Sequence, residues 1–192
     1  YGYASYQYRY DARGSIIETA VFGVDGKPTL NKYGYASFRK EYDALGNTIK
    51  VAVFGVDGKP TLQRKGFASY TNEYDARGNT IETVFFGVDG KPTLNKDGYA
   101  SFRKEYDALG NRIETTYFGV DGKLALNKWD VSRWTKTYNE RNKVVLQTYF
   151  GLDNKMKANS SGCAQKKTHY DARGQKTRTS CLALDGSVVT EL

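Results

Sequence analysis

The chain is poor in the residues that build helical cores and catalytic centres. Its 192 residues include one methionine, one histidine, two cysteines and three prolines, whereas sixteen are tyrosine. No apolar run approaches the roughly 18 residues that a membrane-spanning helix needs, and no signal peptide is recognisable. Many tyrosines beside one methionine are unusual for a helical globule and typical of half-exposed β-sheets. The composition therefore predicts a β protein without a transmembrane segment.

What the chain does contain is a 32-residue repeat. Its opening tyrosine recurs without insertion or deletion, at Tyr10, Tyr42, Tyr74, Tyr106, Tyr138 and Tyr170. The heptapeptide FGVDGKP occurs at 22–28, 54–60 and 86–92. A fixed period of this length is typical of a repeat architecture, in which each unit buries its apolar side against its neighbours. Near-identity between copies also argues against a unique active site in any one of them.

Each repeat is expected to contain one β-hairpin. Two runs rich in aromatic and β-branched residues, 98–107 and 111–121, flank the tripeptide ALG at 108–110. The preceding Asp can accept hydrogen bonds from later backbone amides, and the Gly can adopt the left-handed conformation that closes a three-residue hairpin loop with a bulge. In a later copy two turn glycines become Asn142 and Asn154. Asn tolerates that conformation best after Gly, so the turns should survive.

The loop length predicts the register of the hairpin and hence its two faces. The loop would place Tyr106 opposite Arg112. Strict alternation would then place Glu105 opposite Ile113. The first face, which we expect to be the core, carries Ala100, Phe102, Tyr106, Phe118 and Val120. The second face is mixed and could be solvated or functional; it carries Tyr99, Ser101, Arg103, Glu105, Ile113, Thr115 and Tyr117.

We therefore predict an all-β fold, an elongated array of hairpin repeats in an antiparallel sheet or a solenoid-like arrangement. Residues 1–137 would hold the regular repeats, with units starting at Tyr10, Tyr42, Tyr74 and Tyr106. Residues 138–192 would hold divergent repeats that cap the array, because terminal repeats must cover an exposed edge. Cys163 and Cys181 lie in this region, one diagonal step apart on the same expected face. A disulfide and a buried pair of free thiols both remain open.

The net charge of +8 is concentrated in one repeat. Residues 138–169 carry an excess of four positive charges, because two acidic residues oppose Arg141, Lys143, Lys155, Lys157, Lys166 and Lys167. An array that bound nucleic acid along its length would carry a Lys and Arg excess in every repeat. The pattern argues against a nucleic-acid partner and fits a local anionic partner better.

The sequence carries no catalytic or cofactor signature. His169 has no Cys or His near it at metal-ligand spacing. The recurring Asp75, Glu82 and Asp89 are explained as turn and strand residues. The VDGK loop lacks the alternating acidic residues of a calcium loop, and no glycine-rich phosphate loop precedes a helix. We therefore expect no enzyme activity, no cofactor and no metal site.

Several motifs resemble known tandem repeats. YDARGNTIE, YDALGNRIE and YDARGQKTR resemble the YD repeats of the bacterial Rhs family, whose signature is Tyr-Asp, two residues and then Gly. FGVDGKP is similar to the FGADGK-type element of glucan- and choline-binding cell-wall repeats, and MORN-type repeats are a third similar class. The YD resemblance implies a bacterial structural shell, often at the surface or secreted. The cell-wall resemblance implies carbohydrate binding by surface aromatic residues.

Two functions follow as alternatives. The first is a non-enzymatic scaffold or protein-interaction module of a bacterial multidomain or surface protein, able to self-assemble through its sheet edges. The second is binding of a cell-wall or glucan carbohydrate by exposed Tyr and Trp. The expected partners are proteins or further copies of the chain, and then a cell-surface glycan; an extracellular or cell-surface location is favoured. The candidate binding surface comprises Tyr35, Tyr99, Tyr117, Trp129, Trp134, Lys166 and Lys167.

Overall fold

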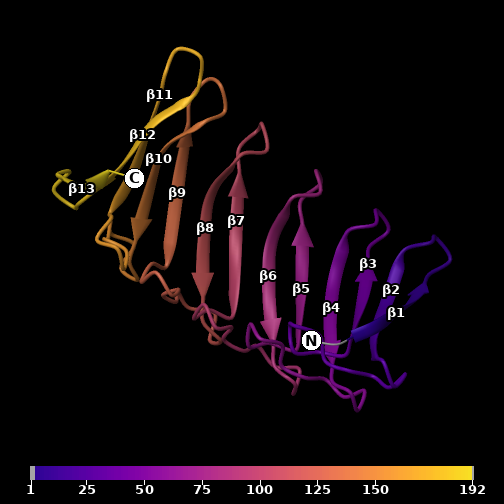
Figure 1. The fold of residues 1–192 in the computed structure, drawn as a ribbon. Helices are drawn as coiled ribbons and strands as arrows, with labels where there is room; N and C mark the ends of the chain where they lie inside the picture. Colours follow the sequence, from indigo (N-terminus) through magenta and orange to yellow (C-terminus); the bar gives the residue numbers. More distant parts are fainter. Residues whose placement is uncertain (1–2, 192) are drawn as a thin grey trace. The chain divides into compact units, whose positions relative to one another are not determined.

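The computed structural model describes residues 3–191, and in this range it contains strands and turns but no helix (Figure 1). Its thirteen strands follow one another in sequence order in one antiparallel sheet. Each strand is therefore hydrogen-bonded to the strands next to it in the sequence. This arrangement confirms the expected all-β fold of tandem hairpins.

The strands alternate between the two arms of each hairpin. The first arms are β1 (Tyr3–Tyr10), β3 (Ser37–Tyr42), β5 (Ser69–Tyr74), β7 (Ser101–Tyr106), β9 (Arg133–Tyr138) and β11 (Gln165–Tyr170). The second arms are β2 (Ile16–Gly23), β4 (Thr48–Phe54), β6 (Thr80–Phe86), β8 (Arg112–Phe118), β10 (Val144–Phe150) and β12 (Lys176–Leu182). A short last strand, β13 (Val188–Glu191), pairs with β12.

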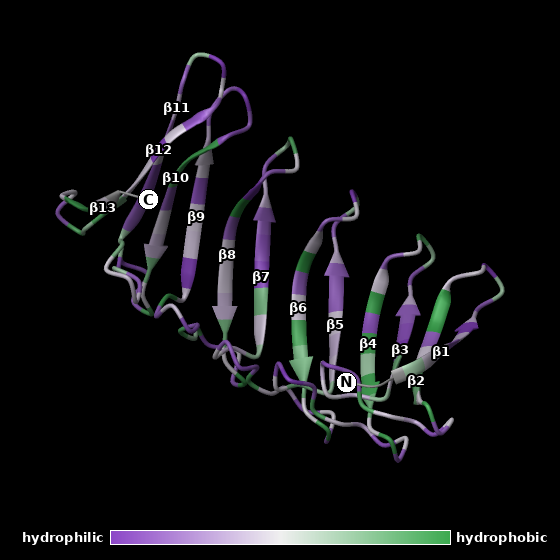
Figure 2. Cartoon of the chain, in the orientation of Figure 1, coloured by the Kyte–Doolittle hydropathy of each residue, from purple (hydrophilic) through white to green (hydrophobic). Residues whose placement is uncertain are grey.

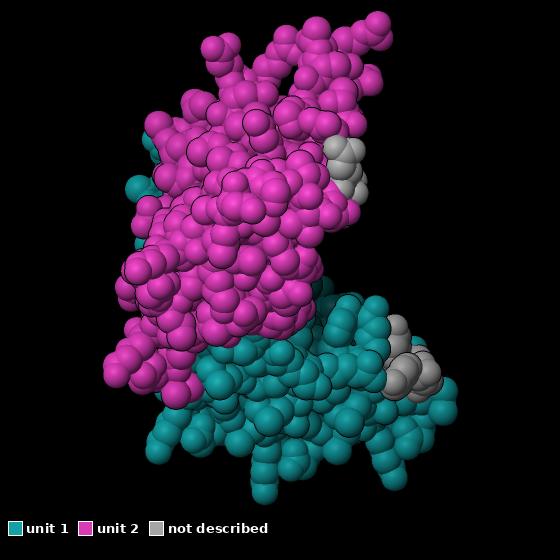
Figure 3. Space-filling model, turned by 90° about the vertical axis from the view of Figure 1, so that its left-hand side faces the viewer, with its two compact units in different colours: residues 1–101 teal, residues 102–192 magenta. Residues whose placement is uncertain are grey.

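The chain divides into two compact units (Figure 3). The first runs to residue 101 and the second begins at residue 102, within β7. The same hairpin geometry recurs in both units. The boundary that we expected at residue 138 marks where the repeat sequences begin to diverge and is a different boundary from this one. The capping role of residues 138–192 stays a prediction.

A β-bulge follows the opening tyrosine of the hairpins. In the β3–β4 hairpin, Tyr42 lies opposite Thr48. Its neighbour Glu41 lies opposite Lys50, so Ile49 is the extra residue that faces no partner. The same one-residue shift occurs in the β1–β2, β5–β6, β9–β10 and β11–β12 hairpins. An extra residue in one strand moves every later side chain of that strand to the other face.

The bulge overturns the faces expected from strict alternation. The expected pairing of the residue before the tyrosine with the isoleucine is wrong by one position. Thr115 and Tyr117, which we placed on the mixed face, are only 3% and 8% exposed. Val120, which we placed in the core, is 57% exposed. The second arm therefore buries the alternate set of its side chains, and the hairpin tip stays as expected.

The core lies where each linker folds back against the sheet. The backbone N–H of Val21 donates to the carbonyl of Ala36 (2.8 Å), and the N–H of Ala36 donates to the carbonyl of Phe54 (2.8 Å). The second arms carry hydrophobic stretches, as β4 and β6 show in Figure 2, whereas β3 and β5 are largely hydrophilic. Apart from Trp134 on the first arm β9, the buried apolar residues come from the second arms and from the linkers; they include Val21, Ala36, Val53, Phe67, Phe85, Tyr117, Val131, Tyr149 and Cys163.

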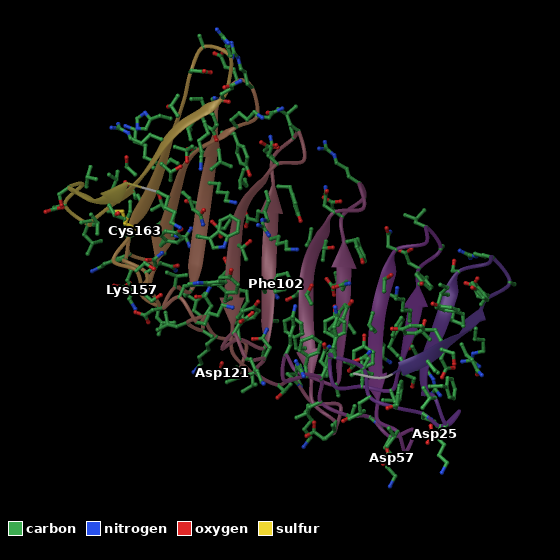
Figure 4. All side chains as sticks on the ribbon, in the orientation of Figure 1. Asp25, Asp57, Phe102, Asp121, Lys157 and Cys163 are labelled. Atoms are coloured by element: carbon green, nitrogen blue, oxygen red, sulfur yellow. A yellow bond between two sulfur atoms is a disulfide. The ribbon has the colours of Figure 1, made fainter. Side chains whose placement is uncertain are left out.

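Acidic or amide side chains close the turns, as the sequence predicted for the hairpin tip. The Asp43 Oδ1 accepts hydrogen bonds from the backbone N–H groups of Leu45 (2.9 Å) and Asn47 (2.8 Å). The Asn47 side-chain amide donates to the second oxygen of Asp43 (2.9 Å), and this bond holds the pKa of that carboxyl below its ordinary value. The linker turns use Asp in the same way, as at Asp25 and Asp57 (Figure 4).

Three residues other than glycine occupy left-handed turn positions. Asn142 has a φ of 56° and Asn154 a φ of 60°, which confirms the expectation for both. Asp130, with a φ of 64°, is a third case that we did not foresee; most other copies hold Gly at this position. Short side chains that bond locally are the ones that tolerate this conformation.

In four copies the opening tyrosine joins its hairpin to the preceding one. The Tyr42 hydroxyl donates to the carbonyl of Ile16 (2.8 Å), and the Tyr138 hydroxyl donates to the carbonyl of Arg112 (2.8 Å). Tyr74 and Tyr170 make the equivalent bonds. Each bond links residues 26 positions apart, from one hairpin to the next.

Cys163 and Cys181 form a disulfide (Figure 4). Their Cα atoms lie 5.2 Å apart, and both side chains are buried. This resolves the two alternatives that the sequence left open. The bond joins the linker before β11 to the end of β12, so it closes the last hairpin.

We predict that the Tyr42→Phe substitution lowers the free energy of unfolding by about 1 kcal/mol, because the Ile16 carbonyl loses a partly buried hydrogen bond. Urea unfolding followed by circular dichroism measures the change. Tyr10→Phe is the matched control, since the Tyr10 hydroxyl makes no hydrogen bond to the described residues and the side chain is 54% exposed. Equal losses in the two variants would contradict the assigned role of the hydroxyl.

Removal of the disulfide should destabilise the chain by roughly 3 kcal/mol, as expected for a bond that closes a loop of this size. The two cysteines are 18 residues apart. The double variant Cys163→Ala, Cys181→Ala and the chemically reduced parent should unfold at similar urea concentrations, below that of the oxidised parent. A reductant that shifts the double variant as much as the parent would disprove this assignment.

Candidate surface cleft

Four of the seven expected surface residues line one cleft in the second unit. These are Tyr117, Trp129, Trp134 and Lys166, and the cleft has a volume of about 350 Å³. Asn127, Gln147 and Tyr149 are among its other lining residues. The β8–β10 strands supply its floor, the linkers between hairpins supply a wall, and β11 supplies Lys166.

The floor of the cleft is a buried aromatic layer. The indole Nε1 of Trp134 donates to the hydroxyl of Tyr117 (3.1 Å), and Trp134 is only 6% exposed. Tyr149 lies opposite Trp134 on the neighbouring strand. Burial raises the pKa of Tyr149, and the nearby Tyr117 adds to the effect. Because Tyr117 and Trp134 are both buried, they form this floor and offer no exposed stacking platform.

Trp129 forms the exposed wall. It lies on the linker between β8 and β9 and is 48% exposed. Its backbone N–H donates to the Asn127 Oδ1 (2.9 Å), and its carbonyl accepts from the N–H of Ser160 in the next linker (2.8 Å). The Lys128 ammonium lies 4.5 Å from the centre of the Trp129 ring. The indole is thus carried by a fixed stretch of backbone.

Asn127 leaves a hydrogen-bond donor unused beside the cleft. Its Oδ1 accepts from the N–H groups of Trp129 (2.9 Å) and Val131 (3.4 Å), which fixes the orientation of the amide. Its Nδ2 is buried and has no hydrogen-bond partner among the described residues. The side chain is 5% exposed and lines the cleft. Our sequence reasoning missed this residue, although Asn also stands at 31, 95 and 159 in the same repeat position.

The surroundings of the cleft are electropositive. Lys136 and Arg112 both lie over the Trp134 ring, at 4.7 Å and 4.6 Å from its centre. Burial lowers the pKa of Lys136, and repulsion from Arg112 lowers it further. Lys166 lies opposite Gln147 across the β10–β11 pair. No Asp or Glu is among the described residues that line the cleft.

The first unit holds an equivalent cleft of about 300 Å³. Tyr33 stands there at the repeat position of Trp129, and Tyr35 and Phe38 stand at those of Val131 and Trp134. The rings of Tyr33 and Tyr35 are stacked, with centres 6.2 Å apart. The candidate residue Tyr35 therefore lies in a second copy of the same site.

The two remaining candidate residues lie outside both clefts. Tyr99 is half-buried in the first unit, with its ring 6.0 Å from that of Phe85. Lys167 is exposed and follows Lys166 on β11, so it points to the opposite face of the sheet. Neither residue belongs to the lining of the Trp129 cleft, and a role for Tyr99 or Lys167 in binding elsewhere on the chain stays a prediction.

Within residues 3–191, no group of three or more His, Cys, Asp or Glu side chains is placed to hold a metal ion. No helix in the described part of the chain has the length and apolar character to cross a membrane. His169 lies on β11 opposite Arg178 of β12.

Fold and cleft together define a tandem β-hairpin repeat with aromatic surface sites. No family model and no curated protein matches the sequence. Among solved structures, the crystal structure of TcdB2-TccC3-TEV is similar over 91% of this chain, at 17% identity and a TM-score of 0.50. A mutant Tc holotoxin pore of Photorhabdus luminescens is similar over 92% of this chain, at 14% identity and a TM-score of 0.41. The matches cover 9% and 10% of those chains, and the likeness to the first shows a shared fold alone.

We predict that the two tryptophans differ strongly in hydrogen exchange. The buried, hydrogen-bonded Nε1–H of Trp134 should exchange slowly with solvent, and the indole N–H of the half-exposed Trp129 should exchange quickly. The chain has two tryptophans, so nitrogen-edited NMR resolves one indole signal for each. Tyr117→Phe should accelerate exchange at Trp134 and leave Trp129 unchanged. Equal exchange rates in the parent would contradict the buried floor.

Proposed function

We propose that the chain is a non-enzymatic structural section of a larger bacterial assembly, which associates with protein partners through its sheet. The similarity to the TcdB2-TccC3-TEV structure carries this proposal, since nearly all of this chain matches a small part of a much longer one. The resemblance of the hairpin tips to YD repeats supports the same role, because it implies a structural shell. Near-identical copies fit a role that depends on repetition rather than on one unique site.

Strand β1 is a candidate surface for such association. Among the described strands it is first in the strand order, and β2 is the described strand to which it is hydrogen-bonded. Tyr6, Tyr8 and Tyr10 are exposed along it, and neighbouring ring centres lie 6.3 Å and 6.4 Å apart. Unpaired strand edges recruit further strands, and aromatic residues are enriched in interfaces.

Tyr10 gives this edge a specific acceptor requirement. In the later copies the equivalent hydroxyl donates to a carbonyl of the preceding hairpin, as at Tyr42 and Tyr138. Tyr10 has the same position in its repeat and makes no hydrogen bond to the described residues. A strand that pairs with β1, from a preceding repeat of the same protein, from a further copy or from a partner protein, would supply this carbonyl.

Light scattering coupled to size-exclusion chromatography over a wide concentration range tests the proposal. We expect the mass of the parent to rise with concentration and the variant Tyr8→Lys to stay monomeric, because charge on an edge strand opposes pairing. Val24→Lys is the matched control, since Val24 is an exposed apolar residue in a linker. A parent that stays monomeric throughout, or equal effects of the two lysines, would overturn association through β1.

A further inference from the structure

We propose that the cleft around Trp129 binds an acidic sugar, that is, a pyranose ring that carries a carboxylate. The cleft lies within the second unit, among strands β8 to β11. The inference goes beyond the structural role proposed above and does not depend on it. It rests on one stacking surface, one unused donor, one ammonium group and the recurrence of the cleft.

The stacking surface is the indole of Trp129. The ring is half-exposed, yet its backbone is held by the side chain of Asn127 and by the N–H of Ser160. A flat aromatic face of this kind packs against the C–H face of a sugar ring, and little conformational entropy is lost when the platform is already fixed.

The unused donor is the Nδ2 of Asn127, which is buried at the lining of the cleft, so a small shift of the neighbouring side chains must uncover it before a ligand oxygen can accept from it. A buried amide group without a hydrogen bond costs about 1–3 kcal/mol, and a ligand oxygen that accepted this bond would recover part of that cost. Gln147, Asn159 and Ser161 also line the cleft. Carboxamides and hydroxyls both donate and accept, so they match the neighbouring hydroxyl groups of a sugar better than they match an aromatic acid.

The charge of the cleft selects an anion. Lys166 lines it and is half-buried, and the ammonium of Lys128 stands over the Trp129 ring. No acidic side chain is present among the described lining residues. A cationic ligand would meet only like charges, whereas a carboxylate would form a charge-assisted hydrogen bond with the Lys166 ammonium.

Whether a copy carries the cleft can be compared through the linker position that Trp129 occupies in its repeat. Five copies of this position hold Tyr33, Lys65, Asp97, Trp129 and Ser161. The two aromatic residues line the two equivalent clefts, each together with the residue at the same position one repeat later, Lys65 or Ser161. The first-unit cleft also lacks acidic lining residues among those described, but Tyr70 stands there in place of Lys166. The Trp129 cleft should therefore bind the acidic sugar more tightly.

Isothermal titration of the full chain with a galacturonate trisaccharide tests the proposal, with a glucose trisaccharide as the neutral comparison. Lys166→Gln should weaken galacturonate binding by about tenfold or more, as loss of a charged hydrogen bond predicts. Lys167→Gln removes the same charge from the adjacent residue on the other face and should change affinity by less than about twofold. Trp129→Ala should abolish binding of the acidic sugar.

Three results would overturn the site. They are equal losses in Lys166→Gln and Lys167→Gln, equal affinity for the neutral trisaccharide, and no heat of binding at millimolar sugar. Urea unfolding of each variant shows that it is folded, and both lysine variants are conservative enough to keep the strand. The edge variant Tyr8→Lys should bind galacturonate like the parent, so failure of the structural role and failure of the sugar site are distinguishable.

Discussion

A single hairpin cannot bury its own apolar side, and the rest of the structure depends on this constraint. Isolated two-stranded hairpins are marginally stable in water, so each one here is completed by its neighbours. The linker that follows β2 returns along the sheet, and the carbonyl of its residue Ala36 accepts a hydrogen bond from the backbone N–H of Val21. The opening tyrosine of the next copy then donates a hydrogen bond to the preceding hairpin, as from the Tyr42 hydroxyl to the Ile16 carbonyl. The interfaces between neighbouring copies therefore contribute to stability as much as the contacts within each copy.

The parts of the fold that could be predicted are those set by residues close together in the sequence. Asp43 and its turn glycine act within four residues, so the hairpin tip follows from local chemistry. The same reasoning placed Asn142 and Asn154 correctly in left-handed turns. The bulge at Ile49 was missed because the order of apolar and polar residues along the strand is the same with or without an unpaired residue. The position of the bulge depends on which side chains of the second arm the linkers can bury. That depends on the assembled sheet and not on the local sequence.

The same distinction applies to the cleft. Trp129 and Trp134 are the two tryptophans of the sequence and Lys166 belongs to its most basic copy, and the structure brings the three residues together. Their unequal exposure could not be read from the sequence, since it depends on the shifted register. Asn127 went unnoticed because it conforms to the repeat. Its unused Nδ2 arises from the carbonyl oxygen's role in closing a turn, which the sequence shows only once that turn is known.

The near-identity of the copies has a consequence for how the chain reaches this structure. The segment at 35–47 is repeated without change at 99–111, so a strand searching for its partner meets two chemically equal surfaces. Kinetic trapping by such swapped pairings is a characteristic failure of repeat proteins. The diverged copies escape it, because Trp134 and the pair Cys163–Cys181 occur once each. The diverged copies can therefore pair in one way only, and correct pairing there fixes the order in which the remaining hairpins pair.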